Sequence, residues 1–234
     1  GYQALETNTT GGSNVALGSL ALESNTTASG NVGIGYQALY ANTTGADNIA
    51  IGKEALRDNS TATGNIAIGR NSLNLNTTGA SNVAVGYTAL SRNTTGADNT
   101  AVGYTALVLN TTGIRHTVLG SLALDANTTG TQNTAIGYQA ATSSTTGSYN
   151  VGAGYKALEK VTTGNYNTAL GYQAASSGTN DLTTGSNNIV IGDNAAASSA
   201  TVSNEITLGN TTAGTLRIPP IQSGASAGDV MTFD

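Results

Sequence analysis

Apolar and polar residues alternate along this chain in a frame that repeats every 17 residues. Near the end of each block, counted from an opening glycine, position 17 is aliphatic, and position 15 is Val or Ile in eight of the twelve blocks and Thr in the other four. Ile49-Ala50-Ile51 is an example. Two such residues separated by one have the period of a β-strand, and the run is too short for a helix. The pattern predicts one strand per block. Blocks open with glycine at 1, 18, 35, 52, 69, 86, 103, 120, 137, 154 and 171 and, after a four-residue insertion, at 192 and 209.

A second extended segment is predicted at positions 3 to 7, as at residues 37–41, because position 5 is Leu in nine of the twelve blocks. Asn-Thr-Thr-Gly and the opening glycine turn the corners, since Asn and Gly tolerate positive φ. Each block then forms one coil of an all-β, parallel β-roll or β-solenoid. Twelve coils at a spacing of about 4.8 Å make a rod of roughly 58 Å.

Polar residues also recur in register. Position 14 is Asn in ten of the twelve blocks, the exceptions being His116 and Glu205, and position 10 is Thr in all twelve. Stacked coils place these side chains over their own copies, where amides can bond to one another. We interpret both series, including the lone His116, as structural ladders.

Position 16 lies between the two aliphatic residues of each block and is Ala in seven of them, Ala84 among these. We expect positions 15 and 17 to face the interior and position 16 to face outward. A small apolar residue on an outer face favours close contact with another copy of the strand, hence a closed homo-oligomer.

The composition excludes several classes of function. A net charge of −5, with only eight basic residues, argues against nucleic-acid binding and against an anionic membrane surface. With no cysteine, thiolate metal sites and disulfides are excluded. The sequence shows neither a transmembrane stretch nor a signal peptide. It begins in phase with a repeat and without Met, so we expect a piece of a longer protein.

Three segments imitate catalytic motifs. G-x-G-x-x-A occurs from Gly33 and from Gly152, yet a dinucleotide site needs a strand, this turn and a helix. Residues 224–228 match G-x-S-x-G, but the only histidine, His116, precedes that serine. The acidic residues do not recur on adjacent coils. We therefore expect no enzyme, no catalytic residue, no cofactor and no metal site.

Departures from the repeat are the candidate surface features. The insertion at residues 178–181 extends one corner loop, as insertions in solenoids do. Tyrosines at position 2 stack on three consecutive coils near the same end, where they either bind a receptor or seal a corner or subunit contact. The candidate receptor contacts are Thr179, Asn180, Asp181, Tyr138, Tyr155 and Tyr172.

The corner sequence Asn-Thr-Thr is also an N-x-[ST] glycosylation acceptor. The simpler interpretation is that Asn and Thr build the corner. Adjacent threonines resemble an ice-binding array as well, but neighbouring residues point to opposite faces, which disfavours it. The candidate acceptors are Asn8, Asn25, Asn42, Asn59, Asn76, Asn93, Asn110 and Asn127.

The motif Asn-Thr-Ala-Ile-Gly-Tyr-Gln-Ala-Ala at residues 133–141 resembles the head repeat of trimeric autotransporter adhesins of the YadA type, and the same repeat in phage tail fibres. The resemblance covers residues 1–208. It implies a left-handed parallel β-roll, three chains around one axis and two short strands per coil. Residues 204–218 resemble the segment that ends such rolls in phage tail fibres.

The sequence thus predicts two regions, the repeat at 1–208 and a terminal cap and connector at 209–234, leading into a further domain. We expect a homotrimeric, extracellular structural or adhesive fibre whose partner is a host cell-surface glycan or protein. A phage tail fibre segment, on the virion, is the first hypothesis. The alternatives are the head of a bacterial surface adhesin and a glycosylated or ice-active filament.

Overall fold

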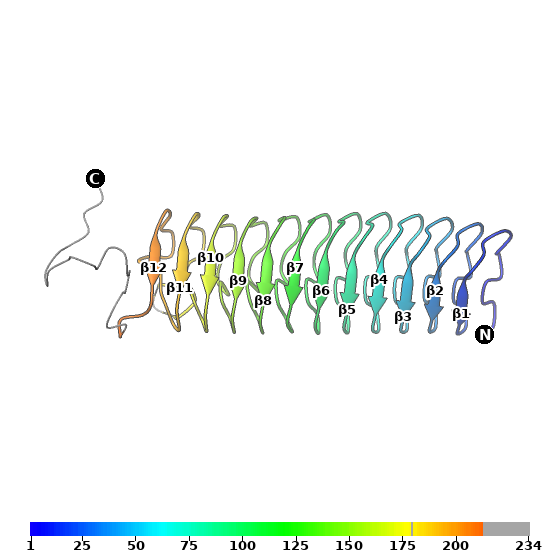
Figure 1. The fold of residues 1–234 in the computed structure, drawn as a ribbon, viewed down its shortest axis with the longest axis horizontal. Coiled ribbons are helices and arrows are strands. Elements are labelled where there is room, and N and C mark those ends of the chain that lie inside the picture. Colours follow the sequence, from blue (N-terminus) through cyan, green and yellow to red (C-terminus); the bar gives the residue numbers. More distant parts are fainter. Residues whose placement is uncertain (179, 213–234) are drawn as a thin grey trace, which may run out of the picture.

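Twelve strands of three residues lie side by side in one parallel sheet that forms a wall of a rod (Figure 1). The computed structural model describes residues 1–178 and 180–212. Within these residues the chain is all-β and contains no helix. The strands follow in chain order: β1 (Val15–Leu17), β2 (Val32–Ile34), β3 (Ile49–Ile51), β4 (Ile66–Ile68), β5 (Val83–Val85), β6 (Thr100–Val102), β7 (Thr117–Leu119), β8 (Thr134–Ile136), β9 (Val151–Ala153), β10 (Thr168–Leu170), β11 (Ile189–Ile191) and β12 (Ile206–Leu208).

Every strand pairs with the equivalent residues of the next coil. Ile49 lies opposite Ile66 across β3 and β4, and the Ile49 N–H donates to the Asn65 carbonyl at 2.8 Å. The four-residue insertion leaves this register intact, because Thr168 of β10 still pairs with Ile189 of β11. The predicted parallel solenoid with one strand per 17-residue coil is confirmed. Residues 213–234, which hold most of the predicted cap and connector, lie outside the described residues.

The wall opposite the strands differs from the prediction. Positions 3 and 5 adopt positive φ, 55° at Gln37 and 54° at Leu39, so positions 3 to 7 form consecutive turns. Each turn still bonds to the next coil, as when the Leu39 N–H donates to the Ala55 carbonyl at 3.1 Å. The second extended segment, and two strands per coil, were therefore wrong. Burial of the leucine offsets the unfavourable left-handed backbone.

The side of each strand that faces the interior is also the reverse of the expectation. Position 16 is fully buried in β2 to β11, as at Ala50, Ala67 and Ala84, and packs in one cluster with the leucines of position 5. A Cβ added at Gly33 would lie 3.2 Å from Leu22 Cγ, which shows how closely the two walls approach. The leucines fill the narrow interior, so only a small residue fits opposite them, and positions 15 and 17 face outward.

The opening glycine is required by both backbone conformation and space. Gly86 has a φ of 137°, and a Cβ there would overlap the carbonyl oxygen of Gly103 in the next coil. Glycine alone among the amino acids tolerates this close approach at little cost. The residue that sets the period is thus the one at which adjacent coils approach most closely.

Candidate interaction surface

The outer face of the sheet is an apolar strip that runs the length of the rod. It consists of positions 15 and 17 of all twelve strands, which are aliphatic except for threonine at position 15 of β6, β7, β8 and β10, and we call it the apolar face. Ile68 is 38% exposed and Leu119 is 51% exposed, although both are aliphatic. Soluble monomers rarely expose large contiguous apolar patches, so such a strip marks an interaction site. Its most exposed members are Val15, Leu17, Ile51, Ile68, Leu119, Ile136, Leu170, Ile189, Ile191, Ile206 and Leu208.

Stacked tyrosines accompany the apolar face in its C-terminal half. Tyr138, Tyr155 and Tyr172, the predicted series, stack with ring centroids 5.6 and 5.0 Å apart. Tyr149 and Tyr166 form a second stack at position 13, at 4.8 Å, which our sequence analysis overlooked despite their 17-residue spacing. Because adjacent rings cover one another's faces, the exposed parts of the inner rings are their edges. A sugar ring cannot stack on the faces between them.

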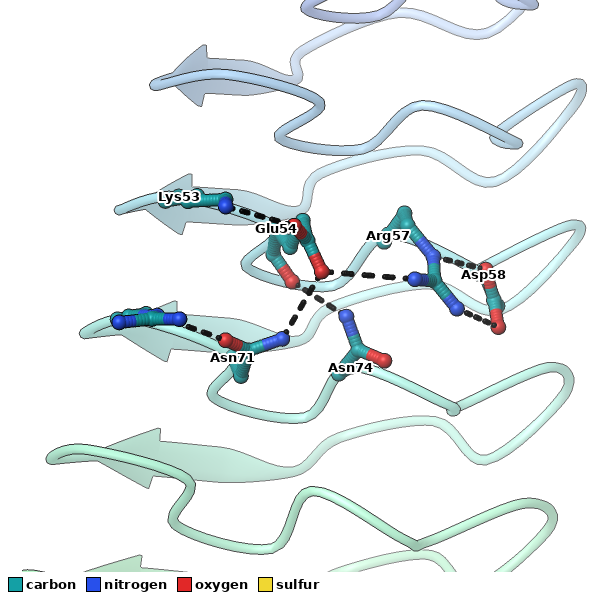
Figure 2. Close-up of polar contacts among 7 residues, drawn as sticks. Lys53, Glu54, Arg57, Asp58, Asn71 and Asn74 are labelled. Atoms are coloured by element: carbon teal, nitrogen blue, oxygen red, sulfur yellow. Dashed lines mark hydrogen bonds and ion pairs between the residues drawn. The ribbon is translucent and has the colours of Figure 1, made fainter.

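A compact group of charges occupies the corner between coils 4 and 5 (Figure 2). Glu54 lies at its centre, 3.3 Å from Lys53 Nζ and 3.5 Å from Arg57 Nη1, and accepts a hydrogen bond from Asn71 Nδ2 at 3.1 Å. Arg57 also forms a bidentate pair with Asp58, at 2.7 and 2.9 Å. This group was not predicted from the sequence.

This group stabilises the corner and leaves little free charge for a ligand. Burial alone would raise the pKa of Glu54, but the hydrogen bonds from Asn71 and Lys53, with the charges of Lys53 and Arg57, lower it below its ordinary value. Asn74 Nδ2 ties the same residue's backbone carbonyl to the next coil at 2.8 Å (Figure 2). Exposed pairs of this kind contribute at most about 1 kcal/mol each.

The insertion forms a short loop at the C-terminal end of the rod. Asp181 Oδ1 accepts a hydrogen bond from the Gly178 N–H at 2.6 Å, and Asn180 lines a hollow of about 640 Å³. Amides and hydroxyls, including Asn194, Thr207 and Asn210, form the rest of its polar lining. Tyr172 does not line this hollow, so the loop and the tyrosine series remain separate candidates. Thr179, the remaining residue of the insertion, lies outside the described residues.

The Asn-Thr-Thr corners contain a buried ladder of amides. Asn42 Nδ2 donates to Asn25 Oδ1 at 3.0 Å and to the Gly45 carbonyl at 2.9 Å, and most other coils repeat this pair. Seven of the eight candidate acceptors are fully buried, and Asn8 at the first coil is half-buried. A glycan would have to replace these buried bonds, so the geometry favours the corner interpretation. Glycosylation itself stays a prediction.

This position 8 ladder stops inside the rod. The amide of Asn127 and the Oδ1 of Asn110 have no partner, and neither does the Ser144 hydroxyl in the next coil. The following two coils have apolar residues at this position, Val161 and Leu182. The position 14 ladder, in contrast, continues to Glu205, whose N–H donates to Asn188 Oδ1 at 3.0 Å.

His116 replaces asparagine in the position 14 ladder, as the sequence predicts. Its Nε2 lies 2.8 Å from the Gly130 carbonyl, and its Nδ1 accepts the Asn133 N–H at 3.2 Å. This pairing requires the neutral tautomer with hydrogen on Nε2. Burial lowers the pKa of His116 from 6.5 to about 4, against the opposing effect of its backbone hydrogen bonds.

The catalytic look-alikes lack their structural context. Gly33 and Gly152 are the central residues of β2 and β9, and turns follow both strands. Residues 224–228 lie outside the described residues. Within residues 1–178 and 180–212, no helix is long and apolar enough to cross a membrane.

Comparison with known proteins adds no relative. No family model, no curated protein and no solved structure matches this chain.

Proposed function

We propose that this chain is a segment of a homotrimeric phage tail fibre, a structural rod that holds a host-receptor-binding element away from the virion. The apolar face is the observation that carries the proposal. A single chain leaves it in water along twelve strands, while the interior behind it is already filled. The chain therefore has a complete core and a second apolar surface that needs a partner.

A second copy of the chain is the partner that fits. The face repeats at every coil, so an in-register copy covers it along its full length, and closed symmetry then buries all copies equally. Three chains and a left-handed coil follow the resemblance to trimeric fibres. A virion and host surface receptor follow the same resemblance, and the corners and the insertion loop remain free for such contacts.

The test is the mass and shape of the purified chain. Light scattering after gel filtration should give three times the 23.2 kDa protomer, and electron microscopy should show a straight rod. A stable 23.2 kDa monomer would contradict the assembly. Antibodies to the rod, applied to virions and to bacteria from the source culture, separate the tail fibre from the bacterial adhesin. Labelling of cell surfaces alone overturns the phage assignment.

A further inference from the structure

The apolar face has two different edges. The residue at position 13 precedes each strand, and we call this series the leading rim; the residue at position 2 follows each strand, and we call it the trailing rim. Positions 14 and 16 between them are buried, whereas nearly all rim residues are exposed. The leading rim is Ser13, Gly30, Asp47, Gly64, Ser81, Asp98, Arg115, Gln132, Tyr149, Tyr166, Asn187 and Asn204. The trailing rim is Ser19, Tyr36, Lys53, Arg70, Tyr87, Tyr104, Ser121, Tyr138, Tyr155, Tyr172, Asp193 and Asn210.

Tyrosine occupies both rims only in coils 9 and 10. Five of the ten tyrosines fall within residues 138–172, and Tyr149 and Tyr166 of the leading rim lie across β9 and β10 from Tyr155 and Tyr172 of the trailing rim. All five are between 40% and 59% exposed. Between the two stacks, β9 carries Ala153, the smallest residue at position 17 of any strand.

The charges on the rims are arranged so that like charges avoid one another. Among the twelve described strands, only β3 has a charge on both rims, and the two are opposite in sign, because Asp47 precedes the strand and Lys53 follows it. Arg115, which precedes β7, lies across that strand from the neutral Ser121. An in-register contact between the two rims would therefore place every charge beside a neutral residue or an opposite charge, which favours the contact.

We propose that in the fibre the trailing rim of each protomer packs against the leading rim of the next. Tyr138, Tyr155 and Tyr172 of one chain then contact Tyr149 and Tyr166 of its neighbour, which makes coils 9 to 11 the tightest subunit contact. This inference rests on the proposed self-association of the apolar face. In a closed ring of identical chains each contact joins two different surfaces, which these two rims provide.

Paired cysteines test which rims meet, because the chain has no native cysteine. Ser121→Cys and Gln132→Cys place one thiol on each rim, beside the neighbouring strands β7 and β8, without removing a tyrosine. With a short bismaleimide, the double variant should give covalent trimers on a denaturing gel, and each single variant only monomers. Covalent dimers from a single variant would mean that like rims meet and would overturn the proposal.

Light scattering on the same samples distinguishes a failure of the rim pairing from a failure of the proposed fibre. Trimers that do not cross-link in the double variant contradict the rim pairing and leave the proposed fibre standing. Monomers contradict the proposed fibre itself.

The role of the tyrosines is tested by two matched double variants. Tyr149→Ser with Tyr166→Ser removes the leading-rim stack. Tyr87→Ser with Tyr104→Ser removes another trailing-rim stack, with ring centroids 5.4 Å apart, that has no tyrosines opposite it. The first should raise the subunit dissociation constant roughly tenfold more than the second. Phenylalanine at 149 and 166 should restore most of the affinity. Equal effects of the two serine pairs would contradict an aromatic contact between the rims.

Discussion

At the residue scale, His116 shows that the ladder selects a hydrogen-bonding pattern and not a residue type. An asparagine amide and a neutral imidazole both donate to the carbonyl 14 residues along and both accept the N–H of the next coil, although the amide also donates to the asparagine of the preceding coil. A protonated ring would present two donors and would leave the Asn133 N–H without its acceptor. The ladder therefore tolerates histidine only in its neutral form.

The rod should lose stability on mild acidification. The pKa of His116 is about 4 in the folded chain against 6.5 ordinarily, so the unfolded chain binds a proton first as the pH falls. The stability that the neutral His116 contributes is fully present above about pH 6.5. It is lost progressively toward pH 4, by roughly 3 kcal/mol in total. Thermal melting followed by circular dichroism between pH 7 and pH 4 measures it.

His116→Asn is the control, since it restores the amide of the other coils. The carboxylates titrate in both chains, so the difference between the two melting curves isolates the imidazole. The melting temperature of the variant should fall less steeply as the pH is lowered. Parallel pH dependence in the two chains would contradict a neutral, buried His116.

The consecutive turns at positions 3 to 7 could not be predicted from single residues. Leu39 gives no local sign of its φ of 54°, because leucine disfavours the left-handed region. Its buried packing against the next coils decides the conformation. Such tertiary control cannot be recognised from one residue, and the turns were mistaken for an extended segment.

At the element scale, each strand has two apolar sides, and alternation alone does not tell which is buried. The larger residues at positions 15 and 17 were expected in the interior, whereas the room left by the opposing leucines admits only a small side chain, from glycine to the valine of Val118 and Val190. We predict opposite consequences for adjacent substitutions in β4. Ala67→Glu should destabilise the protomer by roughly 3 kcal/mol or more, because the charge enters a filled core.

Ile68→Glu, one residue along, should leave the protomer folded and abolish its self-association. Circular dichroism reports the first property and light scattering the second. A trimeric Ile68→Glu chain, or an Ala67→Glu chain of native stability, would show that the apolar face has been wrongly assigned.

The interrupted ladder provides a second matched pair. Asn76→Val removes the partners of Asn59 Oδ1, the Gly79 carbonyl and Asn93 Nδ2, and should cost about 3 kcal/mol. Asn127→Val, at the same repeat position, removes an amide that has no partner and should cost less than about 1 kcal/mol. Urea unfolding midpoints measure both, and equal costs would argue that the ladder continues through Asn127.

At the scale of the whole molecule, the period alone predicts the rod, because every coil contacts mainly its neighbours. The candidate surface was predicted less completely. Tyr138, Tyr155 and Tyr172 stack as expected, but the apolar face was assigned to the wrong side and the Tyr149–Tyr166 stack was missed. The stacking of side chains follows from their 17-residue spacing, whereas the side of a strand that is buried depends on the side chains of the opposite wall.

Removal of a whole coil should therefore be tolerated. Deletion of residues 69–85 joins β4 directly to the coil of β6 and should shorten the rod by about 4.8 Å with little change in melting temperature. Deletion of residues 69–77 instead breaks the 17-residue frame and should destabilise the adjoining coils. Small-angle scattering and thermal melting distinguish the outcomes. A similar loss of stability in both would contradict independent coils.

The direction of the coil-to-coil hydrogen bonds governs how the rod responds to mechanical load. In a stack of parallel strands these bonds lie along the long axis. Tension on the two ends therefore separates one coil after another from its neighbour. Each coil that opens replaces about 5 Å of rod length with roughly 55 Å of extended chain, so the rod lengthens under load before it breaks.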